Sequence, residues 1–277
     1  MGKSFLRVQF SRFLNFLMNC IMIELDEIAL KQSAVVFSPH PDDETLGCGG
    51  TIIKKRMMGG DVTIVFMTDG SRSHRHLISE EELKSIRAGE ALAASRVLGV
   101  DDKDLIFLEF KDGKLDKNRE LAVSKVVNIL IDRKPEEVFI PYYKEQSSWS
   151  EDHSATNMIV MHALQIYGKR AVIYEYPIGF WYQWPWVARR PTSSIQEHLN
   201  ILKEGFLSSL SMLKDFRYFV DINEVLEIKR EALDQYKSQM TRLFQDPQWQ
   251  TLPNLSDGEF LACFFQNYEI FRRYNVQ

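Results

Sequence analysis

Residues 33–50 constrain the fold more than any other part of the chain, because a buried strand there leads directly into a polar, glycine-rich turn. The apolar run 35–37 indicates a strand that is covered on both faces. Pro39 and Pro41 end this strand, since each lacks a backbone N–H and disfavours helix in the residue before it. Helical spacing begins at Thr45. The polar residues between strand and helix therefore lie at the sheet edge where open α/β sheets bind ligands.

This turn contains one imidazole and three carboxylates. His40 and Asp43 are three residues apart at a helix start, which places both side chains on one face, within reach of a single metal ion. Asp42 and Glu44 point elsewhere, so one aspartate could bind a cation while its neighbour acts as a base. Metal-assisted hydrolysis requires one group that binds the metal and another that accepts a proton. The alternative is a solvated acidic turn that caps a helix.

Strands and helices alternate after residue 33. The pattern predicts strands at 34–38, 62–68, 105–109, 137–141 and 171–175, and helices at 46–58, 80–97, 119–133 and 154–167. Such repetition is typical of an α/β fold with a doubly wound, mainly parallel, Rossmann-like sheet that has helices on both faces.

We expect one domain in three parts. Residues 1–30 form an amphipathic N-terminal helix, residues 31–192 the α/β core, and residues 193–277 a mostly helical C-terminal addition to the same domain. Ser256 and Glu259 have capping-box spacing, which predicts a last helix through Phe271.

The N-terminal segment 5–25 has apolar residues at helical spacing, but polar residues interrupt it too often for a membrane span. The favoured interpretation is a helix that packs on the domain's own core or on a second subunit of a homo-oligomer. A membrane-surface helix and an export signal remain open as alternatives. Because the strand and helix alternation begins only after residue 31, we expect the core to fold without this helix.

Charge and cysteine content limit the partners. The chain has 34 basic and 38 acidic residues, a net charge of -4, which argues against a nucleic-acid binder. Its three cysteines are far apart in sequence, so neither a disulfide framework nor a thiolate zinc site is indicated. We therefore expect a small-molecule partner and a cytoplasmic location.

Several spaced motifs resemble those of one family. They are residues 40–50 (HPDDETLGCGG), residues 62–70 (VTIVFMTDG), and Arg87-x-x-Glu90 before residues 98–100 (LGV). Over roughly residues 33–177 the chain resembles the LmbE-like (PIG-L) de-N-acetylases, zinc enzymes that act on N-acetylglucosamine conjugates. The resemblance implies that His40 and Asp43 bind the metal and that Asp42 is the general base.

A third metal ligand has to come from the carboxyl end of another strand, at the same edge of the sheet. His153 opens a helix after the strand ending at residue 141, where the family places Asp-His-Ser or Asp-His-Arg. Two histidines and one aspartate leave a coordination position open for water, as a catalytic zinc needs. The same set suits Fe²⁺ or another divalent ion, so the spacing does not decide the metal.

The chain departs from the family at Ser150, where many members have a histidine that stabilises the oxyanion. An active enzyme then needs a substitute donor, and His74, after the second strand, is the candidate, with a simply solvated loop at residues 74–76 as the alternative. Asp152, next to His153, is predicted to be an orienting carboxylate.

Two further residues are predicted to contact substrate by the resemblance, Arg87 and Asp112. A helix-surface arginine and a plain Asp-Gly turn are the alternatives. The aromatic segment with Trp181, Trp184 and Trp186 is interpreted either as a substrate wall or as core packing.

These features predict a zinc-dependent hydrolase that acts on a linear amide C–N bond. It would remove acetyl from an N-acetylated sugar of the N-acetylglucosamine type, carried free or linked to a lipid or nucleotide, and release acetate and a free amine. One alternative is a catalytically impaired sugar-binding or scaffold protein, because Ser150 departs from the family. A dinucleotide-binding oxidoreductase is less favoured, since Ile52 stands where the third fingerprint glycine belongs.

Overall fold

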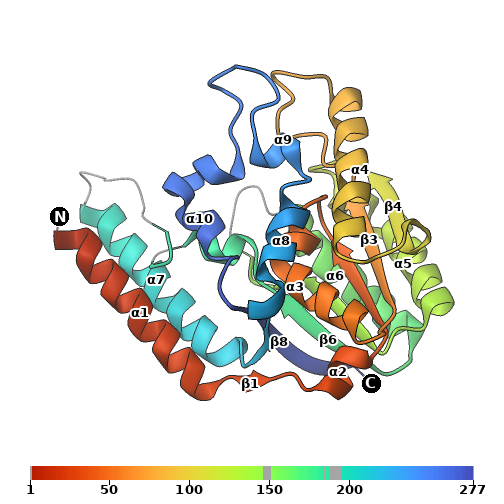
Figure 1. Ribbon diagram of the computed structural model, residues 1–277, viewed down its shortest axis with the longest axis horizontal. Helices are drawn as coiled ribbons and strands as arrows, with labels where there is room; N and C mark the ends of the chain where they lie inside the picture. Colours follow the sequence, from red (N-terminus) through yellow and green to blue (C-terminus); the bar gives the residue numbers. More distant parts are fainter. Residues whose placement is uncertain (1, 146–150, 184, 188–194, 277) are drawn as a thin grey trace.

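The computed structural model describes residues 2–145, 151–183, 185–187 and 195–276. In this part of the chain the strands form one sheet in the order β1-β7-β8-β6-β5-β2-β3-β4 (Figure 1). The strands are β1 (Ile23–Glu24), β2 (Ala34–Ser38), β3 (Val62–Thr68), β4 (Leu105–Phe110), β5 (Glu137–Pro141), β6 (Ala171–Tyr176), β7 (Tyr218–Asp221) and β8 (Tyr268–Val276).

The five strands predicted from the sequence form the parallel half of this sheet. Strands β6, β5, β2, β3 and β4 are neighbours in that order, and each pair is parallel. Numbered along the chain, this is the doubly wound 3-2-1-4-5 order. The winding reverses between β2 and β5, so the carboxyl ends of these two strands border the crevice where such sheets bind ligands.

Helices cover both faces of the sheet. In the view of Figure 1, α3, α4 and α8 lie in front of the sheet and α5 and α6 lie behind it. The helices are α1 (Gly2–Ile21), α2 (Glu27–Lys31), α3 (Asp43–Met57), α4 (Glu80–Val97), α5 (Arg119–Arg133), α6 (Glu151–Tyr167), α7 (Ile195–Asp215), α8 (Leu226–Leu233), α9 (Lys237–Met240) and α10 (Glu259–Ala262). Short 3-10 turns are η1 (Asp102–Asp104), η2 (Leu115–Asn118), η3 (Gly179–Tyr182), η4 (Asn223–Val225) and η5 (Leu252–Gly258).

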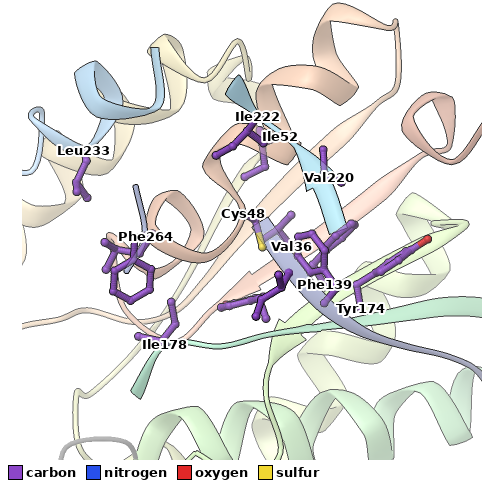
Figure 2. Packing of buried hydrophobic residues seen from close by; sticks show 14 of the residues in the cluster. Val36, Cys48, Ile52, Phe139, Tyr174, Ile178, Val220, Ile222, Leu233 and Phe264 are labelled. Atoms are coloured by element: carbon purple, nitrogen blue, oxygen red, sulfur yellow. The ribbon is translucent and has the colours of Figure 1, made fainter. Parts of the chain in front are cut away.

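The apolar core has two layers because successive strand residues face opposite sides of the sheet. Val36 of β2 packs with α3 and α8 on one face, while Val35 and Phe37 pack with α5 and α6 on the other. Figure 2 shows the first layer, in which Val36 lies near Cys48 of α3. Gly47 is required there, since a Cβ would collide with the ring of Tyr176. This close packing fixes the start of α3 relative to the sheet.

The C-terminal part contributes two strands to the sheet, so the predicted helix from Ser256 through Phe271 is wrong. Ser256 and Asp257 have φ of 50° and 54°, left-handed values that interrupt a helix. The helix that follows ends at Ala262, and β8 then pairs antiparallel with both β6 and β7. The capping-box spacing was a local signal that the strand pairing overrides.

The N-terminal segment belongs to the same core. Leu14 and Met18 of α1 are buried, and β1 pairs in parallel with β7. Helix α1 lies beside α7 in Figure 1. Across the described residues, no helix has both the length and the apolar character needed to span a bilayer.

Candidate metal centre and active site

A sharp turn between β2 and α3 carries the polar cluster. Asp42, directly before the helix, has φ 125° and ψ -28°, a conformation that non-glycine residues rarely adopt. Its backbone N–H donates to Glu44 Oε2 at 3.1 Å, and Arg87 donates to the carbonyl oxygen of Pro41. These contacts hold the strained turn in place.

Three side chains converge at the carboxyl edge of β2 and β5. His40 comes from the turn, Asp43 from the first residue of α3, and His153 from the first turn of α6. Asp43 Oδ2 lies 3.2 Å from His40 Nδ1 and 3.2 Å from His153 Nε2. One atom from each of the three residues lies within 4.8 Å of the other two.

This spacing fits a tetrahedral divalent ion. An ion about 2.0–2.1 Å from each ligand places neighbouring ligand atoms about 3.3 Å apart, close to the 3.2 Å separations observed here. All three residues line a cavity. Three protein ligands would leave a fourth position for water, as in catalytic and not structural zinc sites.

The two adjacent aspartates have opposite electrostatic environments. Burial alone would raise the pKa of Asp43, but the imidazoles of His153 and His40 hold that pKa well below its usual range. Burial raises the pKa of Asp42 to about 8, although the Arg87 guanidinium, 3.1 Å from Asp42 Oδ2, opposes this. The environment of Asp43 therefore suits a charged ligand, while that of Asp42 allows it to hold a proton.

Asp152 contacts His40 and not its sequence neighbour His153. Its Oδ2 lies 3.3 Å from Nε2 of His40, and it also accepts the backbone N–H groups of Gly113 and Leu115. Successive residues on a helix point in different directions, so the carboxylate cannot face the adjacent His153. Asp152 therefore orients His40 and fixes the loop after β4.

Arg87 is buried, and its terminal guanidinium nitrogens contact the turn beside Asp42, while its Nε has no hydrogen-bond partner among the described residues. Besides Pro41 and Asp42, it donates to the carbonyl oxygen of Gly70 at 3.1 Å. Only 3% of the residue is exposed, although it lines the cavity. These contacts indicate that Arg87 positions the turn that contains Asp42.

His74 lines the same cavity, but the structure does not support it as the oxyanion donor. Its Nε2 lies 2.8 Å from the carbonyl oxygen of Gln250, and its Nδ1 lies 3.0 Å from the hydroxyl of Ser73. The ring also stacks on Trp249 at 4.0 Å. Because a neutral imidazole has one N–H, which the Gln250 carbonyl accepts, none is left for a substrate oxygen. Ser150 lies outside the described residues.

The cavity has a volume of about 560 Å³ and two kinds of wall. One wall is charged, and Asp112 belongs to it, with Oδ1 3.4 Å from His40 Nε2. The other is built of amide and apolar side chains, most of them from the C-terminal part: Ile178, Tyr182, Gln239, Gln248, Gln250, Thr251, Leu252, Leu255 and Phe260.

The aromatic segment is mostly core. Trp181 and Trp186 are each 7% exposed and pack against one another and against Phe180. Neither lines the cavity beside His40, whereas Tyr182 does. Trp184 lies outside the described residues.

Sequence reasoning missed Glu145 and the C-terminal wall. Glu145 follows β5 at the carboxyl edge, the same position that singled out His153, so this signal could have found it. The glutamines 239, 248 and 250 are more than 190 residues from the His40 turn and belong to no motif. Tyr236, whose hydroxyl donates to Glu44 Oε1 at 2.5 Å, has no sequence signal either.

Known proteins resemble the part of the chain that carries this site. Residues 35–164 match the family described as PIG-L: GlcNAc-PI de-N-acetylase. Diacetylchitobiose deacetylase of Thermococcus kodakarensis is 27% identical over 209 residues, which are 75% of this chain and 70% of that protein. A probable N-acetyl-alpha-D-glucosaminyl L-malate deacetylase 2 of Bacillus anthracis is 26% identical over 138 residues, 48% of this chain and 60% of its own length.

In three dimensions, nearly the whole chain is similar to a solved deacetylase structure. The structure of N,N'-diacetylchitobiose deacetylase from Pyrococcus horikoshii matches with a TM-score of 0.62 and 22% identity, and the match covers 96% of this chain and 91% of that one. The segment from the His40 turn to His153 lies within the residues that match the family model. The chain is therefore similar to the PIG-L (LmbE-like) deacetylases in the sequence of residues 35–164, and to a solved deacetylase in fold.

Proposed function

We propose that the protein is a metal-dependent hydrolase that removes the acetyl group from an N-acetylated amino sugar. The observation that carries the proposal is the group of His40, Asp43 and His153, which lines one cavity together with a separate buried carboxyl at Asp42. The family and its named relatives, which are deacetylases, support an amide as the bond that is cleaved.

His40 Nδ1, Asp43 Oδ2 and His153 Nε2 are the atoms that would hold the ion. Bound there, a zinc ion would supply Lewis acidity toward the acetyl carbonyl and toward water. We propose zinc, with Fe²⁺ as the alternative, because two imidazoles and a carboxylate suit both ions.

Asp42 is the proposed general base. Its carboxylate takes a proton as the oxygen of water bonds to the acetyl carbon, and it returns a proton to the nitrogen as the C–N bond breaks. The products are acetate and a free amine. Arg87 and Glu44 keep Asp42 in its strained backbone conformation, and Asp152 keeps the His40 ring in place.

The size and lining of the cavity support an amino-sugar substrate. About 560 Å³ lies in the range of small-molecule sites. Amide side chains such as those of Gln248 and Gln250 can exchange hydrogen bonds with hydroxyl groups, and Tyr182 and Phe260 offer apolar contact to ring faces. Asp112, beside His40, is a candidate hydrogen-bond acceptor for a sugar hydroxyl.

The test is acetate release from a panel of N-acetylhexosamine conjugates, measured with and without a chelator. We expect release from at least one conjugate, loss of that activity after chelation, and recovery when zinc is added back. Binding of these sugars without any acetate release would instead favour a sugar-binding protein. Activity that survives complete metal removal would contradict the proposed mechanism.

A further inference from the structure

Helices α1 and α7, which lie on the left side of Figure 1, carry large apolar side chains that remain exposed. Seven large apolar side chains on these helices are 48% to 64% exposed: Phe13, Phe16, Leu199, Leu202, Phe206, Leu207 and Leu210. We call them the α1–α7 face. With about half of each side chain exposed, these residues present roughly 600 Å² of apolar surface to solvent. An apolar patch of this size is at the upper limit for a monomer and marks an interaction surface.

The charge beside this face indicates which partner fits it. Arg12, Lys203 and Lys214 are exposed on the same two helices. Helix α1 contains no acidic residue, whereas the whole chain has a net charge of -4. Glu204 is the exposed carboxylate among the described side chains of the two helices. A symmetric contact with a second copy would bring two faces that both carry these cations together, while an anionic lipid surface would neutralise them.

We propose that the α1–α7 face binds the surface of an anionic lipid bilayer. Phenylalanine and leucine side chains would enter the boundary between headgroups and acyl chains, as in interfacial amphipathic helices. Lysine and arginine would then lie at the level of the phosphates. The helices lie on the surface and do not cross it.

Vesicle sedimentation of the full chain tests this proposal. We expect binding to vesicles of phosphatidylcholine with phosphatidylglycerol, little binding to phosphatidylcholine alone, and weakening by salt. The double variant Phe16→Glu, Phe206→Glu should lose binding, and Lys203→Gln should weaken it about fivefold.

Ile131→Glu is the matched control, because Ile131 is 54% exposed on α5, away from this face. It should bind vesicles like the parent chain. A chain that ignores vesicles but dimerises in ultracentrifugation, and becomes monomeric in the double variant, would overturn the proposal in favour of a second copy. A monomer that binds no vesicle would overturn it as well.

The second ring nitrogen of His153 lies in an unusual environment. Its Nε2 faces Asp43, but its Nδ1 is buried and has no hydrogen-bond partner among the described residues. The nearest charged group is Glu145, whose Oε2 lies 3.9 Å from this nitrogen. A buried N–H without an acceptor is costly, so a carboxylate at this position is informative.

Glu145 is itself held firmly. Its two carboxylate oxygens accept the backbone N–H groups of Ile178 at 2.9 Å and Phe180 at 3.1 Å. Ile178, with Tyr182 of the same segment, lines the cavity. Glu145 therefore ties one cavity wall to the position of His153.

We infer that Glu145 is a positioning residue for the proposed metal centre, on which this inference rests. Its carboxylate would accept the Nδ1–H of His153 once the two atoms close their present separation of 3.9 Å, and this would keep Nε2 unprotonated and directed toward the ion. Histidines that bind metals usually have such a partner on the second nitrogen.

Glu145→Gln tests this role with little change of shape. The amide oxygen can still accept one backbone N–H, but the amide NH₂ would donate to Nδ1 and move the ring proton to Nε2. We expect ¹⁵N NMR of the metal-free variant to show His153 with the proton on Nε2, where the parent has it on Nδ1. Affinity for zinc, measured by chelator competition, should fall 10- to 100-fold.

Glu90→Gln is the control, because Glu90 is also a buried acceptor of a backbone N–H, from Ser238, but touches no proposed ligand. It should leave the tautomer and the zinc affinity unchanged. A parent protein with the His153 proton on Nε2, or equal zinc affinity in Glu145→Gln, would overturn the inference. A parent that binds no zinc would instead refute the metal centre itself.

Discussion

The two walls of the cavity are built in different ways. The turn from His40 to Glu44 consists of charged groups that hydrogen-bond to each other and to the sheet edge. The second wall, formed mostly by residues between Gln239 and Phe260, presents amide and apolar side chains and follows short helices and turns, α9, η5 and α10.

A few contacts attach this second wall to the core. Tyr236 donates to Glu44, Ser238 donates to Glu90, and the carbonyl oxygen of Gln250 accepts from His74. We infer that the reaction depends on the turn, whereas substrate selection depends on the cavity-lining side chains of the second wall, which can vary as long as the contacts of Tyr236 and Ser238 are kept.

The largest effect should come from the ligands on the rigid wall. Asp43→Ala removes the carboxylate that lies 3.2 Å from both histidine nitrogens. We expect bound metal to fall from about one ion per chain to none, and acetate release to fall to background. Metal analysis after dialysis measures this directly. Unchanged metal content would refute the ligand assignment and with it the difference between the walls.

A smaller loss is expected when the base alone is removed. Asp42→Asn should keep the metal, because Asp42 is not one of the converging ligands, and should lower kcat by about 10²- to 10⁴-fold. Metal content and kcat measured on the same sample separate the two roles. A variant with the parent rate would show that another group takes the proton.

The rigid half of the molecule was also the predictable half. The five central strands begin where the sequence predicts and end at most one residue later, because apolar runs and turn residues are local signals. Helices α3 and α6 begin three residues earlier than predicted, at Asp43 and Glu151, since their first turns carry polar site residues.

The rest could not be predicted because it depends on contacts between distant segments. Strand β8 is defined by pairing with β6 and β7, and no local pattern encodes that pairing. The same holds for side-chain direction. Asp152 and His153 are neighbours in sequence, but Asp152 contacts His40 and His153 contacts Asp43. His74 hydrogen-bonds to the carbonyl oxygen of Gln250, which is 176 residues away.

The contact between the two walls offers a third, intermediate prediction. Tyr236→Phe removes the hydroxyl that donates to the buried carboxylate of Glu44, which in turn accepts the N–H of Asp42. We expect the free energy of unfolding to fall by about 1–3 kcal/mol and kcat to fall severalfold.

Tyr274→Phe is the control for that variant, because its hydroxyl donates to Glu175, away from the turn. It should lose stability by urea denaturation but keep its kcat. If both variants have the parent kcat, the second wall does not support the position of Asp42.

The smallest effect on catalysis is expected at His74. If its N–H is held by Gln250, His74→Ala should change kcat by no more than about threefold, whereas loss of an oxyanion donor costs about 10²-fold or more. The variant should instead lose stability, because the stack on Trp249 and two hydrogen bonds disappear.

Burial lowers the pKa of His74 below its ordinary value of 6.5. The unfolded chain then binds a proton more readily as pH falls through 6.5, so His74 stabilises the fold above that pH and less below it. Urea denaturation at pH 7.5 and at pH 5.5 should therefore show a stability difference between parent and variant that shrinks at the lower pH. A difference that grows there would mean that the ring is charged and bound to an acceptor, and a 10²-fold loss of kcat would return His74 to the oxyanion role.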